Sequence, residues 1–203
     1  MEQSQAAVPK RLIVGITGAS GAEIGIQLLR EMQRHPQWET HLVISAGARR
    51  TIRLETDYSV EQVEALATRY HSLGDVGANI ASGTFKTEGM VVAPCSMKTA
   101  AGIAHGYAQS LLLRAADVVI KERRKLVLVA RESPLSTIHL NNLLTLANAG
   151  AVILPPMLTY YHRPNTIQEM TTHIVGKILD VFGIECADFK RWDPDSARPP
   201  TKS

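Results

Sequence analysis

The amino-acid sequence predicts an α/β fold, a three-layer Rossmann-like arrangement in which helices cover both faces of a doubly wound parallel sheet. Short apolar runs alternate with longer segments of helical periodicity along the chain. The first run ends in a glycine-rich turn, as the first strand of such sheets commonly does. Hydrophobic residues make up 45% of the chain but aromatic residues only 5%, so the core must consist of Val, Ile, Leu and Ala, which suits strands buried on both faces.

Each predicted strand is one of the short apolar runs. The strands occupy residues 11–16, 40–44, 90–93, 126–130 and 151–154. The predicted helices alternate with them and occupy residues 24–32, 60–70, 110–122, 136–149 and 166–182. In the last helix Ile167, Met170, Ile174, Ile178 and Val181 recur at spacings of three and four. This alternation of strands and helices predicts one doubly wound domain with a parallel sheet.

The domain is predicted to span residues 11–192, between two mobile ends. Residues 1–10 form an N-terminal extension, and residues 193–203 (DPDSARPPTKS) form a polar, proline-rich tail. No apolar run approaches the roughly 20 residues that cross a bilayer. The first residues also lack the apolar stretch of a signal peptide. We therefore expect a cytoplasmic protein that does not bind membranes.

Charge and ligand-forming residues exclude two further classes. The 22 basic and 19 acidic residues are mixed along the chain and give a net charge of +3, without the basic stripe that a nucleic-acid partner needs. The two cysteines, Cys95 and Cys186, lie far apart, and the seven histidines show no metal-binding spacing. We expect no nucleic-acid partner and no bound metal.

The glycine-rich turn, residues 15–21 (GITGASG), favours a mononucleotide. Glycines permit a tight turn, and the amides of the helix that follows can hold a phosphate. The pattern is G-x-x-G-x-x-G, and the second strand is followed by Ser45 rather than by the acid that holds an adenosine ribose, which disfavours NAD. The turn also lacks the GK[ST] ending of a P-loop, so FMN is more plausible than ATP. A purely structural turn is the alternative.

A second motif, residues 94–99 (PCSMKT), directly follows the third predicted strand. It offers hydroxyls, a cation and a helix start at the carboxyl end of the strand, where a ring edge or a phosphate can bind. The alternative is an ordinary helix start with Ser96 or Thr99 as its N-cap. Cys95 is interpreted as a packed residue, since no histidine lies near it to activate a thiolate.

Two more motifs follow the last two strands. Arg131 and Glu132 place a phosphate-binding cation beside a possible proton carrier, or else form a structural ion pair. Residues 155–164 (PPMLTYYHRP) form a rigid aromatic loop in which the Tyr161 hydroxyl can reach a phosphate. Lys177 lies at the apolar border of the last helix, where snorkelling is the alternative, and Trp192 is either a packing anchor or a lid. Residues 123–125 are interpreted as a solvated helix end.

Seven segments together resemble the UbiX-type flavin prenyltransferases, a family that includes the Pad-type proteins once called phenolic acid decarboxylases. They are VGITGASGAEIG, LETDYS, SGTFKTEGM, PCSMKT, RAADVVIKERR, RESPLS and PPMLTYYHRP, and the similarity runs from residue 11 to residue 192 in unbroken order. The resemblance implies a flavoprotein fold, a homo-dodecamer with active sites at subunit contacts, and FMN as co-substrate. The implied reaction transfers a dimethylallyl group from dimethylallyl phosphate to N5 and C6 of reduced FMN. The product, prenylated FMN, would serve a UbiD-type decarboxylase.

The resemblance also implies roles for individual residues. The FMN contacts are Gly18, Ala19, Ser20, Ser45, Ser96, Met97, Lys98, Thr99 and Arg131. The catalytic set is Ser20, Lys121, Glu132 and Trp192, and the prenyl-phosphate set is Arg114, Lys121, Tyr161 and Lys177. Many relatives carry Arg where Lys177 stands, so this chain keeps the charge but loses the bidentate fork.

Two alternative functions are less favoured. A flavin-dependent cysteine decarboxylase has a related fold, but its asparagine-rich and methionine-containing motifs do not resemble PCSMKT or PPMLTYYHRP. A non-catalytic flavin carrier or accessory subunit of a decarboxylase would yield no modified flavin without its partner. The sequence leaves open whether the donor is a monophosphate or a diphosphate.

Overall fold

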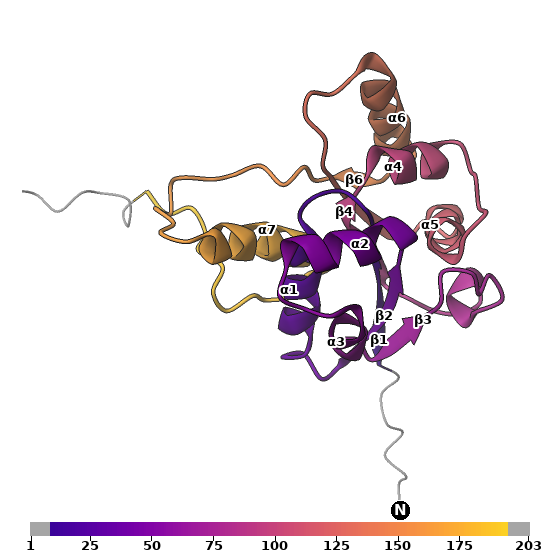
Figure 1. Cartoon of the computed structure of the whole chain (residues 1–203), viewed down its shortest axis with the longest axis horizontal. Coiled ribbons are helices and arrows are strands. Elements are labelled where there is room, and N and C mark those ends of the chain that lie inside the picture. Colours follow the sequence, from indigo (N-terminus) through magenta and orange to yellow (C-terminus); the bar gives the residue numbers. More distant parts are fainter. Residues whose placement is uncertain (1–8, 195–203) are drawn as a thin grey trace, which may run out of the picture.

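The computed structural model describes residues 9–194 and contains one parallel sheet (Figure 1). The expected mobile segments lie outside the described residues, apart from residues 9–10 and 193–194. The sheet has six strands in the order β3-β2-β1-β4-β5-β6. Their bounds are β1 Lys10–Ile16, β2 Trp38–Ile44, β3 Arg69–His71, β4 Gly89–Cys95, β5 Lys125–Ala130 and β6 Val152–Ile153. All neighbouring strands pair in parallel, and the predicted fold class is confirmed.

Helices cover both faces of this sheet and complete the three layers. They are α1 Ala22–Met32, α2 Ala46–Glu55, α3 Val60–Ala65, the 3₁₀ helix η1 Asn79–Ala81, α4 Met97–Ala104, α5 Leu111–Lys121, α6 Thr137–Asn148 and α7 Ile167–Phe182. Residues of α1, α2, α3 and α7 share one apolar cluster, and residues of η1, α4, α5 and α6 share the other. Figure 1 shows α1 and α7 on one side of the central strands and α5 on the opposite side.

Alternation along the strands divides the core between these two clusters. In β1 the side chains of Leu12 and Val14 pack with α1 and α7, whereas Ile13 packs with α5. All three are at most 1% exposed. A strand buried on both faces contributes roughly 1.5–3 kcal/mol for each large aliphatic side chain. The apolar runs read from the sequence are therefore the central strands of the sheet.

The chain between residues 45 and 71 differs from the prediction. The predicted helix over 60–70 is wrong at its end, because α3 stops at Ala65 and Arg69–His71 form the edge strand β3. Reciprocal bonds between Thr40 and Thr68, each backbone N–H donating to the other's hydroxyl at 3.0 Å, dock this segment beside β2. Helix α2 was not predicted, because only Ala48 and Ile52 of its residues are buried and its apolar stripe is short.

The parallel strands bring several loops to one edge of the sheet. The carboxyl ends of β1, β2, β4 and β5 meet there, and α1, α2 and α4 begin there. Ligands of open α/β sheets bind at such an edge. No helix within residues 9–194 is both long and apolar enough to span a bilayer.

Candidate active site

Thr17 joins two of the loops at the carboxyl edge of the sheet. Its hydroxyl, in a residue only 1% exposed, donates to the Pro94 carbonyl at 2.7 Å and accepts from the Ser96 N–H at 2.8 Å. The Thr17 N–H also donates to the Pro94 carbonyl, at 3.2 Å. The glycine turn and the PCSMKT turn are thus held together by buried hydrogen bonds. Sequence reasoning quoted Thr17 within its motif but gave it no role.

Glycines let the loop after β1 approach the loop after β2. A Cβ on Gly18 would lie 3.0 Å from the Cα and the carbonyl carbon of Gly47, a tighter contact than side chains normally tolerate. Gly21 has φ 106°, a conformation that favours glycine. The Ser45 N–H donates to the Ile16 carbonyl at 3.0 Å, and the Ser45 hydroxyl caps α2 by accepting from the Ala48 N–H at 3.1 Å.

The loop after β5 joins the same edge, where the Arg131 N–H donates to the Cys95 carbonyl at 3.1 Å. The predicted FMN contacts therefore come together, although they come from four separate stretches of sequence. Gly18, Ser20, Lys98 and Arg131 are exposed there, whereas Ser96 caps α4 by accepting from the Thr99 N–H at 3.4 Å. The cap that served as the alternative interpretation of Ser96 is thus real, and it leaves the exposed neighbours available to a ligand.

Glu55 lies at this edge and was missed among the predicted site residues. Its carboxylate accepts from the N–H groups of Gly21 and Ala22, at 2.8 and 3.3 Å, so it occupies the amide groups at the start of α1. A negative charge is favourable at a helix N-terminus. The only sequence signal was its place in LETDYS, one of the segments that carried the resemblance. Because α1 already holds a carboxylate, the starts of α2 and α4 are the better positions for a phosphate.

Arg131 and Glu132 do not form the structural ion pair that was their alternative interpretation. Both are exposed, and within residues 9–194 no ion pair involves either side chain. The Glu132 carboxylate accepts from the N–H of the next residue, Ser133, at 3.0 Å. Cys95 is fully buried, and burial raises the pKa of its thiol to about 12, so it is a packed residue and no nucleophile.

Tyr161, Lys177 and Trp192 gather in a second place, beside α7. The rings of Tyr161 and Trp192 meet edge-to-face with centroids 5.3 Å apart. Lys177 is exposed and lies one helical turn after His173, close enough for its charge to lower the pKa of that histidine. We call Tyr161, His162, His173, Phe189 and Trp192 the ring cluster. It brings together three residues that were predicted to contact the prenyl donor or to act in catalysis.

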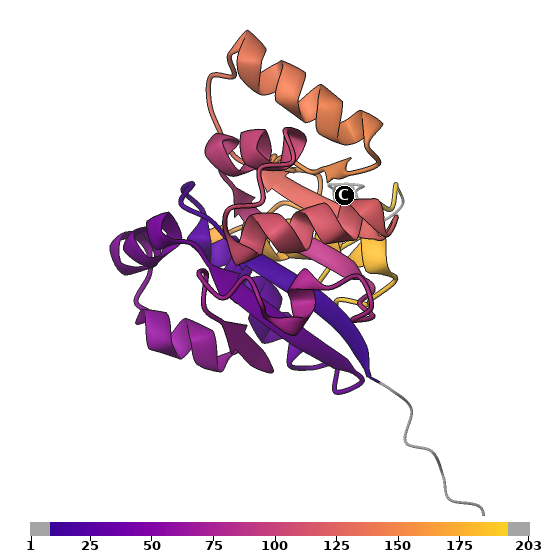
Figure 2. The ribbon, with the colours of Figure 1, turned by 90° about the vertical axis from the view of Figure 1, so that its right-hand side faces the viewer.

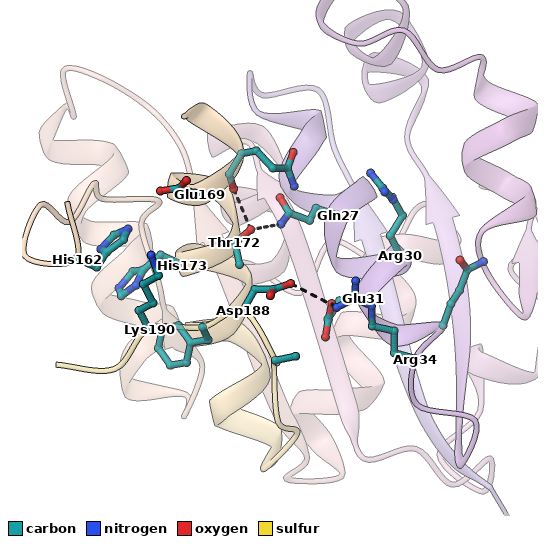
Figure 3. Close-up of a pocket in the computed structure, with 14 residues that line it drawn as sticks. Gln27, Arg30, Glu31, Arg34, His162, Glu169, Thr172, His173, Asp188 and Lys190 are labelled. Carbon is teal, nitrogen blue, oxygen red and sulfur yellow. Dashed lines mark hydrogen bonds and ion pairs between the residues drawn. The ribbon is translucent and has the colours of Figure 1, made fainter. Parts of the chain in front are cut away.

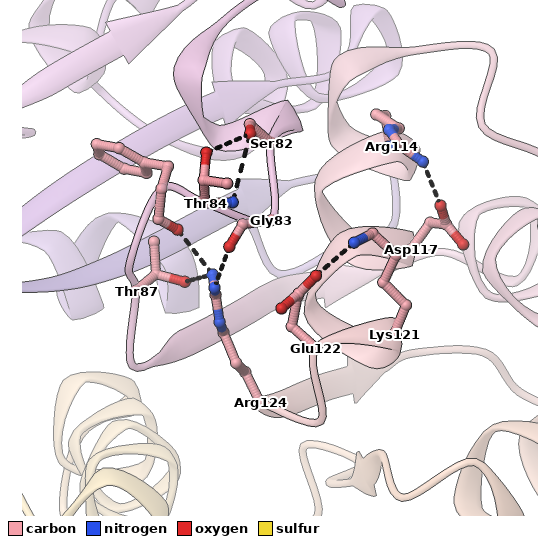
Figure 4. Close-up of polar contacts among 10 residues, drawn as sticks. Ser82, Gly83, Thr84, Thr87, Arg114, Asp117, Lys121, Glu122 and Arg124 are labelled. Carbon is pink, nitrogen blue, oxygen red and sulfur yellow. Dashed lines mark hydrogen bonds and ion pairs between the residues drawn. The ribbon is translucent and has the colours of Figure 1, made fainter.

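The remaining two predicted residues, Arg114 and Lys121, lie on α5 (Figure 4). Arg114 pairs with Asp117 at 2.6 Å, and Lys121 pairs with its neighbour Glu122. Lys121 comes shortly before the first residue of β5, whereas Glu132 follows the last residue of that strand. Within one chain these two predicted catalytic residues therefore lie at opposite edges of the sheet.

The interpretation of residues 123–125 as a solvated helix end is wrong for Arg124 and Lys125. The Arg124 guanidinium donates to the carbonyls of Gly83 and Phe85, at 2.6 and 2.8 Å, and to the Thr87 hydroxyl at 3.2 Å (Figure 4). Lys125 begins β5 and donates to the Val181 carbonyl at 2.7 Å. Sequence reasoning missed these roles because the acceptors are mostly backbone carbonyls, which no residue type reveals.

A cavity of about 760 Å³ lies between α1 and α7 (Figure 3). Its lining includes Gln27 on α1, Thr172 and His173 on α7, and charged residues such as Arg34 and Asp188, which pair at 3.5 Å. None of the residues predicted to bind FMN lines it. It opens on the flank of the molecule behind the ring cluster and is distinct from the carboxyl edge. No group of three or more potential metal ligands occurs in the described part of the chain.

A parallel sheet whose carboxyl edge carries exposed hydroxyls, cations and helix starts defines a flavin-binding α/β protein. In agreement, residues 1–182 match the family model described as Flavoprotein. The chain is 52% identical, over 90% of its length and 97% of the relative's, to a probable UbiX-like flavin prenyltransferase from Sedimentibacter hydroxybenzoicus. The chain belongs to the UbiX-like flavin prenyltransferase family and is an enzyme of the transferase class.

Solved structures agree with this assignment. AnUbiX (PadA1), crystallised with FMN and dimethylallyl pyrophosphate, is 48% identical with a TM-score of 0.89, over 91% of this chain and 98% of that one. A dodecameric FMN-dependent UbiX-like decarboxylase from Escherichia coli O157:H7 is 53% identical with the same TM-score, over 90% of this chain and 99% of that one. The peptidyl-cysteine decarboxylase EpiD, at 16% identity and a TM-score of 0.58, shares the fold alone.

Proposed function

We propose that this chain transfers a dimethylallyl group from dimethylallyl phosphate to N5 and C6 of reduced FMN. The product, prenylated FMN, would be delivered to a UbiD-type decarboxylase. The observation that carries the proposal is the carboxyl edge, where four loops present the residues that resemble FMN contacts in a chain 48% identical to a protein crystallised with FMN and dimethylallyl pyrophosphate. We place the protein in the cytoplasm, where a reducing environment suits its two free cysteines, and cell fractionation tests that location.

The carboxyl edge fits a flavin mononucleotide. Gly18 and Gly47 pack backbone to backbone, so no side chain fills the space above them, and the helix starts of α2 and α4 favour a phosphate. In this proposal Ser20, Ser45, Ser96, Lys98 and Arg131 bind FMN. Ala19, Met97 and Thr99 complete the contacts that the resemblance implies. Reduced FMN supplies an electron-rich ring that forms bonds to the allylic carbon.

The prenyl donor needs cations, because breaking its allylic C–O bond leaves charge on the departing phosphate. Lys121, Arg114 and Lys177 would supply this charge, and the Tyr161 hydroxyl would donate a hydrogen bond to a phosphate oxygen. Trp192, 60% exposed, would cover the apolar group and exclude water. Glu132 would accept the proton lost as the ring closes, since its exposed carboxylate has no competing ion pair within residues 9–194.

Within one chain Lys121 and the ring cluster lie away from the carboxyl edge, so we propose that neighbouring subunits complete each site. Exposed apolar side chains support a large assembly. On α6, which stands at the outer side of the molecule (Figure 2), Ile138, Leu140 and Leu144 are 71%, 52% and 59% exposed. Exposed apolar patches of this kind mark contacts between proteins. A homo-dodecamer, as in the Escherichia coli relative, would bury them.

The assembly can be tested at α6. Leu144→Glu should break the dodecamer into smaller particles and abolish prenylation, because a buried unpaired carboxylate opposes the contact. The matched control is Thr145→Glu, next to it on α6. Light scattering measures the particle, and FMN titration checks that the fold is kept. A dodecamer with full activity in Leu144→Glu would contradict this surface.

The reaction is tested by anaerobic incubation of the purified chain with FMN, a reductant and dimethylallyl phosphate. Mass spectrometry of the released flavin should show one added dimethylallyl group. A parallel incubation with dimethylallyl pyrophosphate identifies the donor. Unmodified FMN in both incubations, with product appearing only when a decarboxylase is added, would favour the accessory-subunit alternative.

A further inference from the structure

Two histidines of the ring cluster lie directly behind Tyr161. His173, on α7 and 5% exposed, stacks on His162 with ring centroids 4.8 Å apart and an interplanar angle of 9°. The Tyr161 ring meets both imidazoles edge-on, at 5.4 Å from His173 and 5.5 Å from His162. Figure 3 shows the two imidazoles lying against each other beside Lys190.

The hydrogen bonds around His173 indicate where its proton lies. Nε2 is 3.5 Å from the Tyr161 hydroxyl, whereas Nδ1 is buried and has no partner within the described residues. A buried N–H without an acceptor is rarer than a bare acceptor, so we assign the proton to Nε2. The Tyr161 hydroxyl donates to the Lys190 carbonyl at 3.4 Å, and its oxygen is free to accept from the His173 Nε2–H.

The surroundings of His173 keep this imidazole neutral. Burial lowers its pKa most, and the charges of His162 and Lys177 lower it further. A neutral ring with one N–H is a donor to the phenol only through Nε2. The parallel stacking of two imidazoles is also consistent with neutral rings, because two imidazolium ions would repel each other at this distance.

Packing holds the His173 ring in position. A Cβ on Gly176 would lie 2.4 Å from the Phe189 ring, so only glycine lets Phe189 pack against α7 at this turn. Phe189 in turn lies against His173, with ring centroids 5.0 Å apart. The rotamer of His173 is therefore limited by Phe189 on one side and by His162 on another.

The geometry points to His173 as a positioning residue that holds the Tyr161 phenol from behind through Nε2–H, so that the Tyr161 O–H can turn from the Lys190 carbonyl to a phosphate oxygen of the prenyl donor. This inference rests on the proposed function. A phenol that accepts a hydrogen bond becomes a stronger donor, because neighbouring hydrogen bonds polarise one another. His173 acts on the donor only through Tyr161.

The test is the steady-state kinetics of His173→Phe with dimethylallyl phosphate as the varied substrate. The substitution keeps an aromatic ring in the stack and removes the N–H. We expect KM for the donor to rise about threefold to tenfold, the effect of one hydrogen bond, while kcat and FMN affinity change little. His162→Phe is the matched control, because it keeps the stack and has no bond to the phenol, so its KM should stay near that of the wild type.

A double-mutant cycle with Tyr161→Phe distinguishes positioning from general packing. If His173 acts through the phenol, adding His173→Phe to Tyr161→Phe should not raise KM further. His173→Gln, whose amide can still donate, should restore most of the wild-type KM. Additive effects, no effect of His173→Phe, or an equal effect of His162→Phe would each overturn the inference. A wild-type enzyme that makes no prenylated flavin would instead refute the proposed function, and the inference with it.

Discussion

The carboxyl edge and the ring cluster hold their functional side chains by different means. At the edge, short hydrogen bonds of 2.7 and 2.8 Å through buried Thr17, and a close contact between two glycines, fix the backbone itself. In the ring cluster, aromatic side chains meet at 4.8–5.5 Å and the Tyr161 hydroxyl makes only long bonds of 3.4 and 3.5 Å. A rigid backbone suits a site that holds a flavin in one orientation. Looser ring contacts suit groups that close on a second substrate.

The largest expected effect concerns Glu132, at the rigid edge. Glu132→Gln keeps the shape but removes the proton-accepting carboxylate, so single-turnover formation of prenylated flavin should slow by about 10² to 10⁴. FMN affinity and melting temperature should stay close to those of the wild type, since no ion pair within residues 9–194 depends on this carboxylate. Wild-type turnover in a folded, FMN-saturated variant would leave the released phosphate as the proton carrier.

A second prediction tests whether the edge depends on Thr17. Thr17→Val removes one hydroxyl and leaves the Pro94 carbonyl and the Ser96 N–H each short of a buried partner. The free energy of unfolding should fall by about 1–3 kcal/mol or more, and FMN affinity should fall with it. Urea unfolding and FMN titration measure the two effects. Thr84→Val, at an exposed threonine, is the control and should stay within about 0.5 kcal/mol of the wild type.

Acid should act on buried histidines rather than on the carboxyl edge. Burial, and next the charge of His71, lower the pKa of His41 to about 4, and burial also lowers the pKa of His173. Because each folded-state pKa lies below the unfolded value, the stabilisation is fully present above about pH 6.5 and is lost as pH falls towards 4. Urea midpoints measured from pH 7.5 to 4.5 should fall with pH. His41→Phe should flatten this dependence, and an unchanged slope would contradict the assignment.

The smallest expected effect is that of a chelator. In the proposed mechanism cationic side chains meet the departing phosphate, so turnover should be the same with a chelator and with added magnesium. Rates measured in both conditions, after dialysis of the enzyme, test this. Loss of turnover in the chelator that magnesium restores would show that a metal shares the charge.

The sequence predicted the central part of the fold well, because hydrophobic burial is a local signal. The apolar runs that became β1, β4 and β5, and the spacing that became α7, follow from which side chains avoid water. It failed where tertiary contacts decided. The edge strand β3 is docked by Thr68 against Thr40, and α2 buries only Ala48 and Ile52, so neither has a strong pattern of its own.

For the site, the sequence by itself determined the four motifs and the family to which they belong, because residue types and their order carry that resemblance. Tertiary structure decided which residues meet. It joined the motifs after β1, β2, β4 and β5 at one edge, placed Lys121 at the opposite edge from Glu132, and set His173 behind Tyr161. Residues distant in sequence have no local signal of their proximity, and contacts to backbone atoms, such as those of Glu55 and Arg124, leave no mark in the partner's residue type.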